Sequence, residues 1–239
     1  MSSHRFPVGA ASVLLCACAL LLSGCVYFTN RTPAGACSND LGSPMRNFCV
    51  VAPGILWRGA RPGRSDAQWL VDHGVGTVVS LELDVRSAFE SARPDPQITR
   101  SVTYFQVRAF NAIQVLTHAH LDAHVALVLA IIEEAPKPVF VSCRAGVDRT
   151  GLMAAAYRVI VEGVSRERAI AEMERFRSPW NPLNARYIRA LSGARSAKIR
   201  RDMDDWESRL RPSGRFDCHG GKCTFARLRA ELNLKPRRP

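Results

Sequence analysis

The chain has 239 residues, 47% of them hydrophobic, which is enough for one domain with extensions and a buried core. Its formal net charge is +12, and residues 195–239 alone hold 13 Lys or Arg against 6 Asp or Glu. Such a basic tail suits an anionic membrane surface or polyphosphorylated molecules, and it is equally typical of a solvated surface. No aromatic-basic pattern accompanies the charge, which argues against nucleic-acid binding.

Residues 1–24 are predicted to be a leader that does not belong to the folded domain. Residues 1–7 carry one Arg and one His, residues 8–22 are apolar, and Leu22-Ser23-Gly24-Cys25 follows. This arrangement resembles the processing box of bacterial lipoproteins. The resemblance implies cleavage before Cys25, lipidation of Cys25 and an address in the bacterial cell envelope, facing the periplasm or the exterior. A transmembrane anchor is the alternative, although it needs about 20 apolar residues and this run is shorter.

Export affects how the other cysteines are interpreted, because disulfides are the expected state in an oxidising compartment. Apart from the leader, Cys25 and one cysteine in the motif described below, the chain retains Cys37, Cys49, Cys218 and Cys223. Four cysteines allow three pairings. We favour Cys37–Cys49 and Cys218–Cys223, since each closes a short local loop. The alternative for the second pair is a metal site with His219, but a second cysteine pair of suitable spacing is missing.

Residues 25–48 are interpreted as a tether and a looped N-terminal segment, and 49–192 as the folded domain. The elements predicted next are a strand at 55–59, a turn at 60–63, a helix at 66–73 capped by Ser65 and ended by Gly74, a strand at 76–83, a polar helix-plus-loop segment at 84–101, a strand at 102–110 and an amphipathic helix at 117–134 capped by Thr117. The apolar face of this last helix is predicted to comprise Leu121, Val125, Leu127, Val128 and Ile131.

The stretch PVFVSCRAGVDRTG at 138–151 is the most informative of the chain. Val139–Val141 predicts a short buried strand and the Ala-rich run 152–161 a helix. Gly146 lets the loop between them curl, so that backbone N–H groups point inward at a helix N-terminus and bind a dianion. The guanidinium of Arg149 matches two phosphate oxygens, and the thiolate of Cys143 is expected beneath the phosphorus. The predicted phosphate-binding residues are Arg144, Ala145, Gly146, Val147, Asp148 and Arg149. The alternative is a strand that ends in an inert buried cysteine.

Beyond this motif the sequence predicts further helices and then a basic tail. These are a helix at 150–162 stopped by Gly163, a helix at 165–177 with Ala169, Ile170 and Met173 facing inward, a break at 178–182 and a helix at 183–211. Residues 193–239 are interpreted as a basic C-terminal helix and tail. Strands that alternate with helices predict an α/β fold with a central, mostly parallel sheet flanked by helices. Ligands of such sheets bind outside the carboxyl ends of the strands, where the Cys143 loop is predicted to lie.

The motif resembles the signature of the cysteine-based protein tyrosine and dual-specificity phosphatases, in the branch that reads Cys-x-x-Gly-x-Asp-Arg-Thr-Gly. The matching residues are Cys143, Gly146, Asp148, Arg149, Thr150 and Gly151. The order Trp57-Arg58-Gly59, Pro62, a helix and a Thr-Val-Val strand is similar to the opening of bacterial and plant-type dual-specificity phosphatases, so the resemblance covers about 55–187. The resemblance implies the protein tyrosine phosphatase-like fold of the dual-specificity phosphatases and a phosphatase that needs no metal or other cofactor. It also implies that Cys143 attacks phosphorus and that Thr150 helps the thiolate leave. A plain helix N-cap is the other role considered for Thr150.

The general acid is the open question of the resemblance. The family usually places an Asp on the loop before the long helix, and here that loop reads Asn111-Ala112-Ile113-Gln114. We expect Asp148 to replace it, because a bound phosphate dianion raises the pKa of a nearby carboxyl. Relatives with Gly-x-Asp-Arg-Thr loops, including myotubularin-like and bacterial lipid-active phosphatases, are thought to use this Asp in the same way. An Asp148 that braces the loop by a salt bridge to a neighbouring Arg is the alternative.

Several other residues depart from the family or lie outside its motif. Ser142 stands where most members have the His that supports the loop and the low thiol pKa, and Val147 where some relatives active on phosphoinositides have Lys. His118, His120 and His124 are predicted to be solvated helix residues rather than metal ligands. Trp57 is expected in the core, Arg58 at the strand or the pocket, and Arg144 in solvent.

The function implied is that of an exported, lipid-anchored phosphatase acting on phosphotyrosine, a phosphoprotein or a small phosphorylated molecule such as an inositol phosphate. A rhodanese-type sulfurtransferase also uses a cysteine in an anion loop, but the Arg149-Thr150-Gly151 sequence argues against it. The non-enzymatic alternative is a phosphoryl-binding pseudophosphatase lipoprotein without turnover. The presence of both Cys143 and Arg149 argues against that, because pseudoenzymes often lose one of the two.

Overall fold

The structure is a computed structural model that describes residues 37–82, 85, 88, 102–107 and 121–210. All of them belong to one compact unit, residues 31–239. In chain order the elements are β1 (Cys49–Ala52), β2 (Leu56–Ala60), α2 (Arg64–Asp72), β3 (Thr77–Ser80), β4 (Thr103–Gln106), α5 (Leu121–Glu134), β5 (Val139–Cys143), α6 (Asp148–Ile160), α7 (Arg166–Glu174), α8 (Asn181–Arg189) and α9 (Gly193–Leu210).

The five strands form one mixed, mostly parallel sheet in the order β1-β2-β5-β3-β4. Only β1 runs antiparallel to its neighbour β2; the pairs β2–β5, β5–β3 and β3–β4 are parallel. All five residues of the central strand β5 are buried, as expected of an apolar strand covered on both faces. Ala60 pairs with Cys143 and Ser80 with Ser142, so β2, β3 and β5 end at the same edge. The predicted α/β architecture is confirmed, although the short strand β1 was not predicted.

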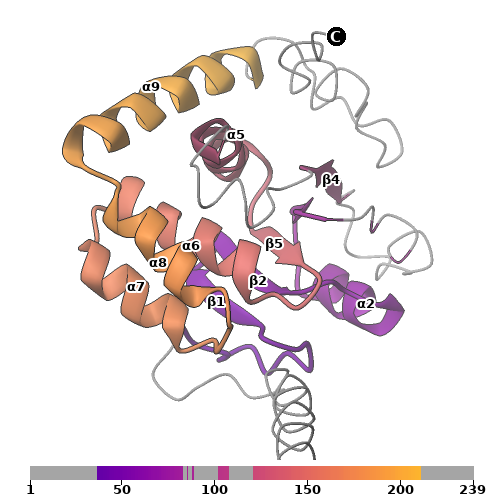
Figure 1. Ribbon diagram of the computed structural model, residues 1–239. Helices are drawn as coiled ribbons and strands as arrows, with labels where there is room; N and C mark the ends of the chain where they lie inside the picture. The colour runs from indigo at the N-terminus through magenta and orange to yellow at the C-terminus, as the bar shows by residue number, and fades with distance from the viewer. Residues whose placement is uncertain (1–36, 83–84, 86–87, 89–101, 108–120, 211–239) are drawn as a thin grey trace, which may run out of the picture. The chain divides into compact units, whose positions relative to one another are not determined.

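The sheet separates two apolar cores, because alternate residues of each strand face opposite sides. Trp57, Val78 and Phe140 face the smaller core under α2, where Phe48 packs against Trp57 with ring centroids 6.0 Å apart. Leu56, Val79 and Val141 face the larger core beneath the helices that follow β4. In Figure 1, α2 lies apart from the group formed by α6, α7 and α8, and α9 runs beside α5. The prediction that Trp57 is a core residue is confirmed.

Helix α5 differs from the amphipathic helix predicted for it. The five residues expected on its apolar face are buried, but so are Ala126, Leu129, Ala130 and Ile132. Helix α9 explains this difference, since it covers the side of α5 that faces away from the sheet with Ile199, Met203 and Trp206, spaced for one helix face. At the start of α5, Asp122 accepts hydrogen bonds from Tyr187 at 2.8 Å and from Arg195 at 2.7 and 3.0 Å. This cluster of three side chains joins α5, α8 and α9.

Several predicted boundaries are corrected by local backbone chemistry. Helix α2 starts after Gly63 rather than Ser65, because the N–H of Gly63 donates to Asp66 Oδ2 at 3.0 Å and so supplies the cap. Ser65 lies within the helix. The single helix expected at 183–211 is two helices, α8 and α9, separated at residues 190–192. Helix α7 begins after Ser165, whose side chain caps it by accepting from the N–H of Arg168, and it ends at Glu174 rather than at residue 177.

The N-terminal end of the described chain is held by a disulfide between Cys37 and Cys49, with Cα atoms 5.5 Å apart. Cys49 begins β1, and Ser38 forms an isolated bridge with Val50 on the same strand. A cross-link that closes a loop of this size stabilises a fold by roughly 3 kcal/mol in the chain-entropy account. One of the two favoured pairings is therefore present in the structure.

Other predictions concern residues outside the described ranges. These are the leader and Cys25, the segment around 84–101, the loop 111–114, Thr117, His118, His120, His219 and the Cys218–Cys223 pair. Among the helices that the structure describes, none is both long enough and apolar enough to cross a membrane.

Candidate active site

The predicted signature forms one strand–loop–helix joint at the shared edge of β2, β3 and β5. Cys143 is the last residue of β5, is 3% exposed and is not in a disulfide. Residues 144–147 form the loop, and α6 begins at Asp148, two residues earlier than predicted. The N-cap residue Val147 makes no side-chain capping bond, so the first N–H groups of α6 lack a side-chain partner at the cap. This joint has the composition of an anion-binding site.

Gly146 fixes how the loop lies against the sheet. Its φ angle is +71°, in the region that favours glycine. A Cβ atom placed on it would come within 2.3 Å of the carbonyl carbon of Gly59 and 2.4 Å of the nitrogen of Ala60. The loop therefore touches the backbone of β2 directly, and no other residue type fits at this position without moving it.

Two buried side chains hold the carbonyl groups of the loop. Asn47 Nδ2 donates to the carbonyl of Ala145 at 2.8 Å, and Arg58 Nη2 donates to the carbonyl of Gly146 at 2.5 Å. Asn47 is 6% exposed and Arg58 1% exposed. Asn47 has a φ angle of +53°, which Asn tolerates better than most residues. The sequence left the role of Arg58 open and did not single out Asn47.

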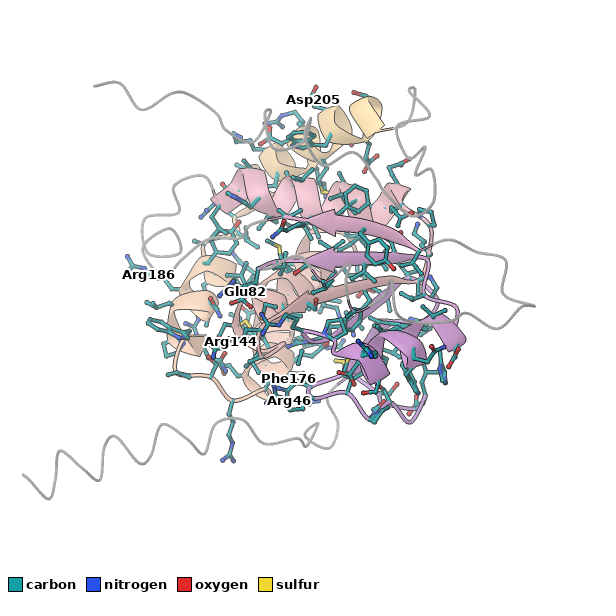
Figure 2. All side chains as sticks on the ribbon, turned by 90° about the vertical axis from the view of Figure 1, so that its right-hand side faces the viewer. Arg46, Glu82, Arg144, Phe176, Arg186 and Asp205 are labelled. Atoms are coloured by element: carbon teal, nitrogen blue, oxygen red, sulfur yellow. A yellow bond between two sulfur atoms is a disulfide. The ribbon has the colours of Figure 1, made fainter. Side chains whose placement is uncertain are left out.

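Arg149, in the first turn of α6, lies against the end of β3. Its Nη1 donates to the carbonyl of Leu81 at 3.2 Å, and its Nη2 lies 3.8 Å from Glu82 Oε1. Arg61 Nη1 lies 3.9 Å from the other carboxylate oxygen of Glu82. Glu82 therefore links the guanidinium groups of Arg61 and Arg149 at the mouth of the joint. Figure 2 shows Glu82 and Arg144 beside this joint, and the predicted exposure of Arg144 is confirmed.

Asp148 is bonded to the segment between α7 and α8. Its Oδ1 accepts a hydrogen bond from the hydroxyl of Ser178, and its backbone carbonyl accepts from Asn184 Nδ2 at 3.4 Å. Burial raises the pKa of Asp148 above its ordinary value, while the charges of Arg149 and Arg58 and a backbone hydrogen bond oppose the shift. A half-buried carboxyl in this setting holds a proton more readily than a free one.

Two hydroxyl groups beside the joint are buried without a hydrogen-bond partner among the described residues. They belong to Ser142, just before Cys143, and to Thr150, in the first turn of α6. Because Val147 is the N-cap of α6, the role of N-cap considered for Thr150 is wrong.

The structure therefore brings the predicted catalytic and phosphate-binding residues into one joint and adds others that the sequence did not single out. The added residues are Asn47, Arg58, Glu82, Ser178 and Asn184. Only Arg58 carried a sequence signal, as part of the Trp57-Arg58-Gly59 match. His124 lies half-buried on α5. Within the described ranges, no group of three or more His, Cys, Asp or Glu side chains is placed to hold a metal ion.

Comparisons with known proteins agree with this geometry. Residues 51–186 match the family described as "DSP-PTPase phosphatase fused to NAD+ Kinase". The chain is 32% identical over 182 residues to the dual specificity protein phosphatase TpbA of Pseudomonas aeruginosa strain UCBPP-PA14, covering 72% of this chain and 75% of that protein.

Two solved structures of P. aeruginosa TpbA are similar to this one. The first has a TM-score of 0.54 at 27% identity, and the second, a cysteine-to-serine variant in complex with pTyr, has a TM-score of 0.53 at 28% identity. Each similarity covers 73% of this chain and 99% of the other. The chain thus belongs to the cysteine-based protein tyrosine and dual-specificity phosphatases.

Proposed function

We propose that this phosphatase hydrolyses phosphate monoesters through a cysteinyl-phosphate intermediate on Cys143. The observation that carries the proposal is the joint itself: a buried thiol ends β5, backbone N–H groups without a capping side chain follow, and Arg149 lies in the first turn of α6. A phosphate dianion bound there would be held by the loop N–H groups and by the Arg149 guanidinium.

The reaction would proceed in two displacements. The Cys143 thiolate attacks phosphorus in line, the S–P bond forms, the P–O bond of the ester breaks, and the leaving oxygen takes a proton. A water molecule then attacks phosphorus and the S–P bond breaks. Inorganic phosphate is released and the Cys143 thiolate is regenerated. The Thr150 hydroxyl, which has no partner among the described residues, is suited to donate a hydrogen bond to the departing sulfur in this second step.

We assign the proton transfers to Asp148. Its raised pKa favours the protonated form that donates to the leaving oxygen, and its bond from Ser178 orients the carboxyl. After the first step the resulting carboxylate can accept a proton from the attacking water. Because the acid must be protonated at the start, the rate with poor leaving groups should fall as the pH rises through the pKa of Asp148.

The substrate class we propose is phosphotyrosine or another molecule whose phosphate stands at a similar distance from its backbone or ring. Support comes from the similarity to the structure of P. aeruginosa TpbA in complex with pTyr. A phosphorylated small molecule, such as an inositol phosphate, is the competing substrate for the same site. A panel of phosphotyrosine peptides, phosphoserine peptides and inositol phosphates, ranked by kcat/KM, decides between them.

We also propose that the protein is exported and anchored to a membrane through lipid on Cys25, with the catalytic unit in the cell envelope. The support is the sequence Leu22-Ser23-Gly24-Cys25 after an apolar run. In bacterial cells the wild-type protein should fractionate with membranes, and Cys25→Ser should lose that association. Equal distribution of the two proteins would contradict the anchor.

The decisive assay is vanadate-sensitive hydrolysis of p-nitrophenyl phosphate. Wild type should turn over, and Cys143→Ser should be inactive while still binding phosphate, because serine keeps the loop but is not ionised. A wild-type protein that binds phosphate without hydrolysing any monoester would instead be the phosphoryl-binding pseudophosphatase.

The role of Asp148 has its own test. Asp148→Asn should slow hydrolysis of aryl phosphates with poor leaving groups by about 100-fold, the usual scale of acid catalysis, and barely affect those with good ones. Equal losses across the leaving-group series would make Asp148 a bracing residue.

A further inference from the structure

The loop that would bind phosphate needs its N–H groups turned inward, and this chain has Ser142 where most of the phosphatases it resembles have His before the cysteine. Ser142 occupies that position and is fully buried, and its hydroxyl has no hydrogen-bond partner in the described part of the chain. Ser142 therefore does not support the loop. Other groups must set the loop conformation.

Asn47 and Arg58 are placed to do so. They donate to consecutive carbonyls, those of Ala145 and Gly146. In a trans peptide the carbonyl and the following N–H point in opposite directions from one rigid plane. When Asn47 holds the Ala145 carbonyl, the N–H of Gly146 is turned the other way; when Arg58 holds the Gly146 carbonyl, so is the N–H of Val147. Two buried donors thus fix two N–H groups of the loop.

The position of Arg58 also brings positive charge behind the loop. Its guanidinium lies 4.0 Å from the ring centroid of Phe176, and its Nε is buried without a partner among the described residues. Burial lowers the pKa of Arg58 to about 10, while the charges of Cys143, Glu172 and Asp148 oppose this shift. The group therefore stays charged at neutral pH although it is fully buried. No carboxylate of the described residues forms an ion pair with it, which leaves its charge available to an anion in the loop.

Asn47 is equally specific to its place. Its positive φ angle would strain most side chains, yet Asn47 keeps it while buried, with its amide donating to the loop. The segment before it is fixed at both ends: Cys37 is bonded to Cys49, and the N–H of Ala60 donates to the carbonyl of Arg46 at 2.9 Å. The N-terminal segment 37–48 is therefore part of the support of the loop.

We infer that Asn47 and Arg58 are positioning residues for catalysis, which set the N–H groups of the loop and place a positive charge behind it. This inference rests on the proposed phosphatase mechanism, which gives the loop its anion. Neither side chain touches the reacting atoms. Each acts through the backbone of residues 145–147 and, for Arg58, through its charge.

The test compares oxyanion binding and kinetics in matched variants. Arg58→Met removes the charge and the donor at similar size, and Arg58→Lys restores the charge. Asn47→Gly removes the amide but tolerates the same backbone angle. The control is Arg195→Met, the same substitution at an arginine bonded to Asp122. Tungstate affinity is measured by calorimetry in the Cys143→Ser background, and kcat and KM are measured with Cys143 intact.

We expect Arg58→Met to weaken tungstate binding and lower kcat/KM by at least about tenfold, the usual loss for a hydrogen bond to a charged group. Asn47→Gly should lose roughly threefold to tenfold, since its donor is neutral. Arg58→Lys should recover part of the tungstate affinity, a rescue that a merely structural role would not give. Folded Arg195→Met should bind tungstate as wild type does.

Affinities within twofold of wild type for both Asn47→Gly and folded Arg58→Met would overturn the inference, as would Arg58→Lys binding no better than Arg58→Met. If Arg58→Met does not fold, Asn47→Gly and Arg58→Lys decide. The outcome is separable from the proposed function. A wild-type protein that binds tungstate without turnover defeats the mechanism but leaves the binding comparison valid, whereas turnover with unaffected variants defeats only this inference.

Discussion

Two arginines of this molecule show how the same side chain serves different ends. Arg195, on α9, makes two bonds to the carboxylate of Asp122 and lies 4.8 Å from the ring of Tyr187. Arg58, on β2, bonds to a backbone carbonyl and packs on Phe176. Burial opposes the charge of both, but the hydrogen bonds to Asp122 raise the pKa of Arg195 above its ordinary value, whereas the pKa of Arg58 is lowered to about 10.

The two arginines differ in whether a carboxylate inside the protein matches their charge. A cation whose charge is matched inside the protein joins helices, as Arg195 does for α5, α8 and α9. A buried cation without a carboxylate partner raises the free energy of the empty protein, and an anion in the adjacent loop offsets that cost. Arg58 lies beneath the loop that we propose binds the anion. We therefore expect substitutions around Arg58 to change activity and substitutions around Arg195 to change stability.

The largest effect is expected from Gly146→Ala, which displaces the loop that Arg58 holds. The added methyl group would come within 2.4 Å of Ala60 nitrogen, and the φ angle of +71° favours glycine. The loop must move, and the Gly146 carbonyl leaves Arg58. We expect kcat/KM to fall by at least about 100-fold, on the scale of losing preorganised oxyanion donors. Gly163→Ala, at a similar φ but with open space around the Cβ, is the control and should keep its activity.

The next effect concerns Arg195. Arg195→Met leaves Asp122 with the hydroxyl of Tyr187 as a donor but without its cation. Breaking a fully buried pair costs about 3–5 kcal/mol, and because this pair is partly exposed we expect about 2 kcal/mol. The measurement is urea denaturation of the variant and of wild type. The kcat/KM of the folded variant should remain within about twofold of wild type. A larger loss of kcat/KM in the folded variant would contradict the contrast with Arg58.

A smaller effect comes from pH at the same cluster. Burial would raise the pKa of Asp122, but hydrogen bonds from Arg195 and Tyr187 hold it below its ordinary value of 3.8. A carboxyl whose pKa is lower in the folded protein contributes its stability above the unfolded pKa and loses it as the pH falls through the folded one. The stability difference between wild type and Asp122→Asn should therefore be full at about pH 6 and shrink below about pH 4. A difference that grows in acid would mean that Asp122 is not the stabilised carboxylate.

The smallest effect is expected from Phe176→Leu, which tests whether the aromatic ring helps to hold Arg58. The substitution keeps an apolar side chain but removes the ring 4.0 Å from the guanidinium. A desolvated cation–π contact contributes about 1–2 kcal/mol, only part of which reaches the loop, so we expect tungstate affinity to fall by roughly threefold. Affinity equal to that of wild type, with unchanged stability, would show that the ring does not help to hold Arg58.

Local patterns in the sequence predicted the part of the fold that depends on neighbours along the chain. The buried strand at β5, the helix after it and the stop at Gly163 follow from apolar runs and glycine. The amphipathic character expected of α5 failed, because α9 covers the face that would otherwise meet water. The break between α8 and α9 was also missed, although Gly193 follows it directly in the sequence.

The site also divides into residues that are close in the sequence, which were predicted, and residues that are far apart in it, most of which were not. Cys143, Arg149, Asp148 and Thr150 lie within eight positions of one another, so their spacing alone brought them together. Asn47, Arg58 and Glu82 reach the joint from 98, 88 and roughly 67 residues away through pairing of β2, β5 and β3 and through the segment before β1. Contacts of that kind have no local signal, because they depend on strand register rather than on neighbouring residues.

The bond between Cys37 and Cys49 carries a consequence for when the enzyme becomes competent. It closes the segment that ends at Asn47, whose amide holds the Ala145 carbonyl. A newly made chain with both thiols reduced lacks this restraint, so we expect it to grip phosphate more weakly until oxidation closes the ring. Formation of the disulfide would then control the phosphatase activity, which would stay low in the reduced chain and rise once the disulfide forms.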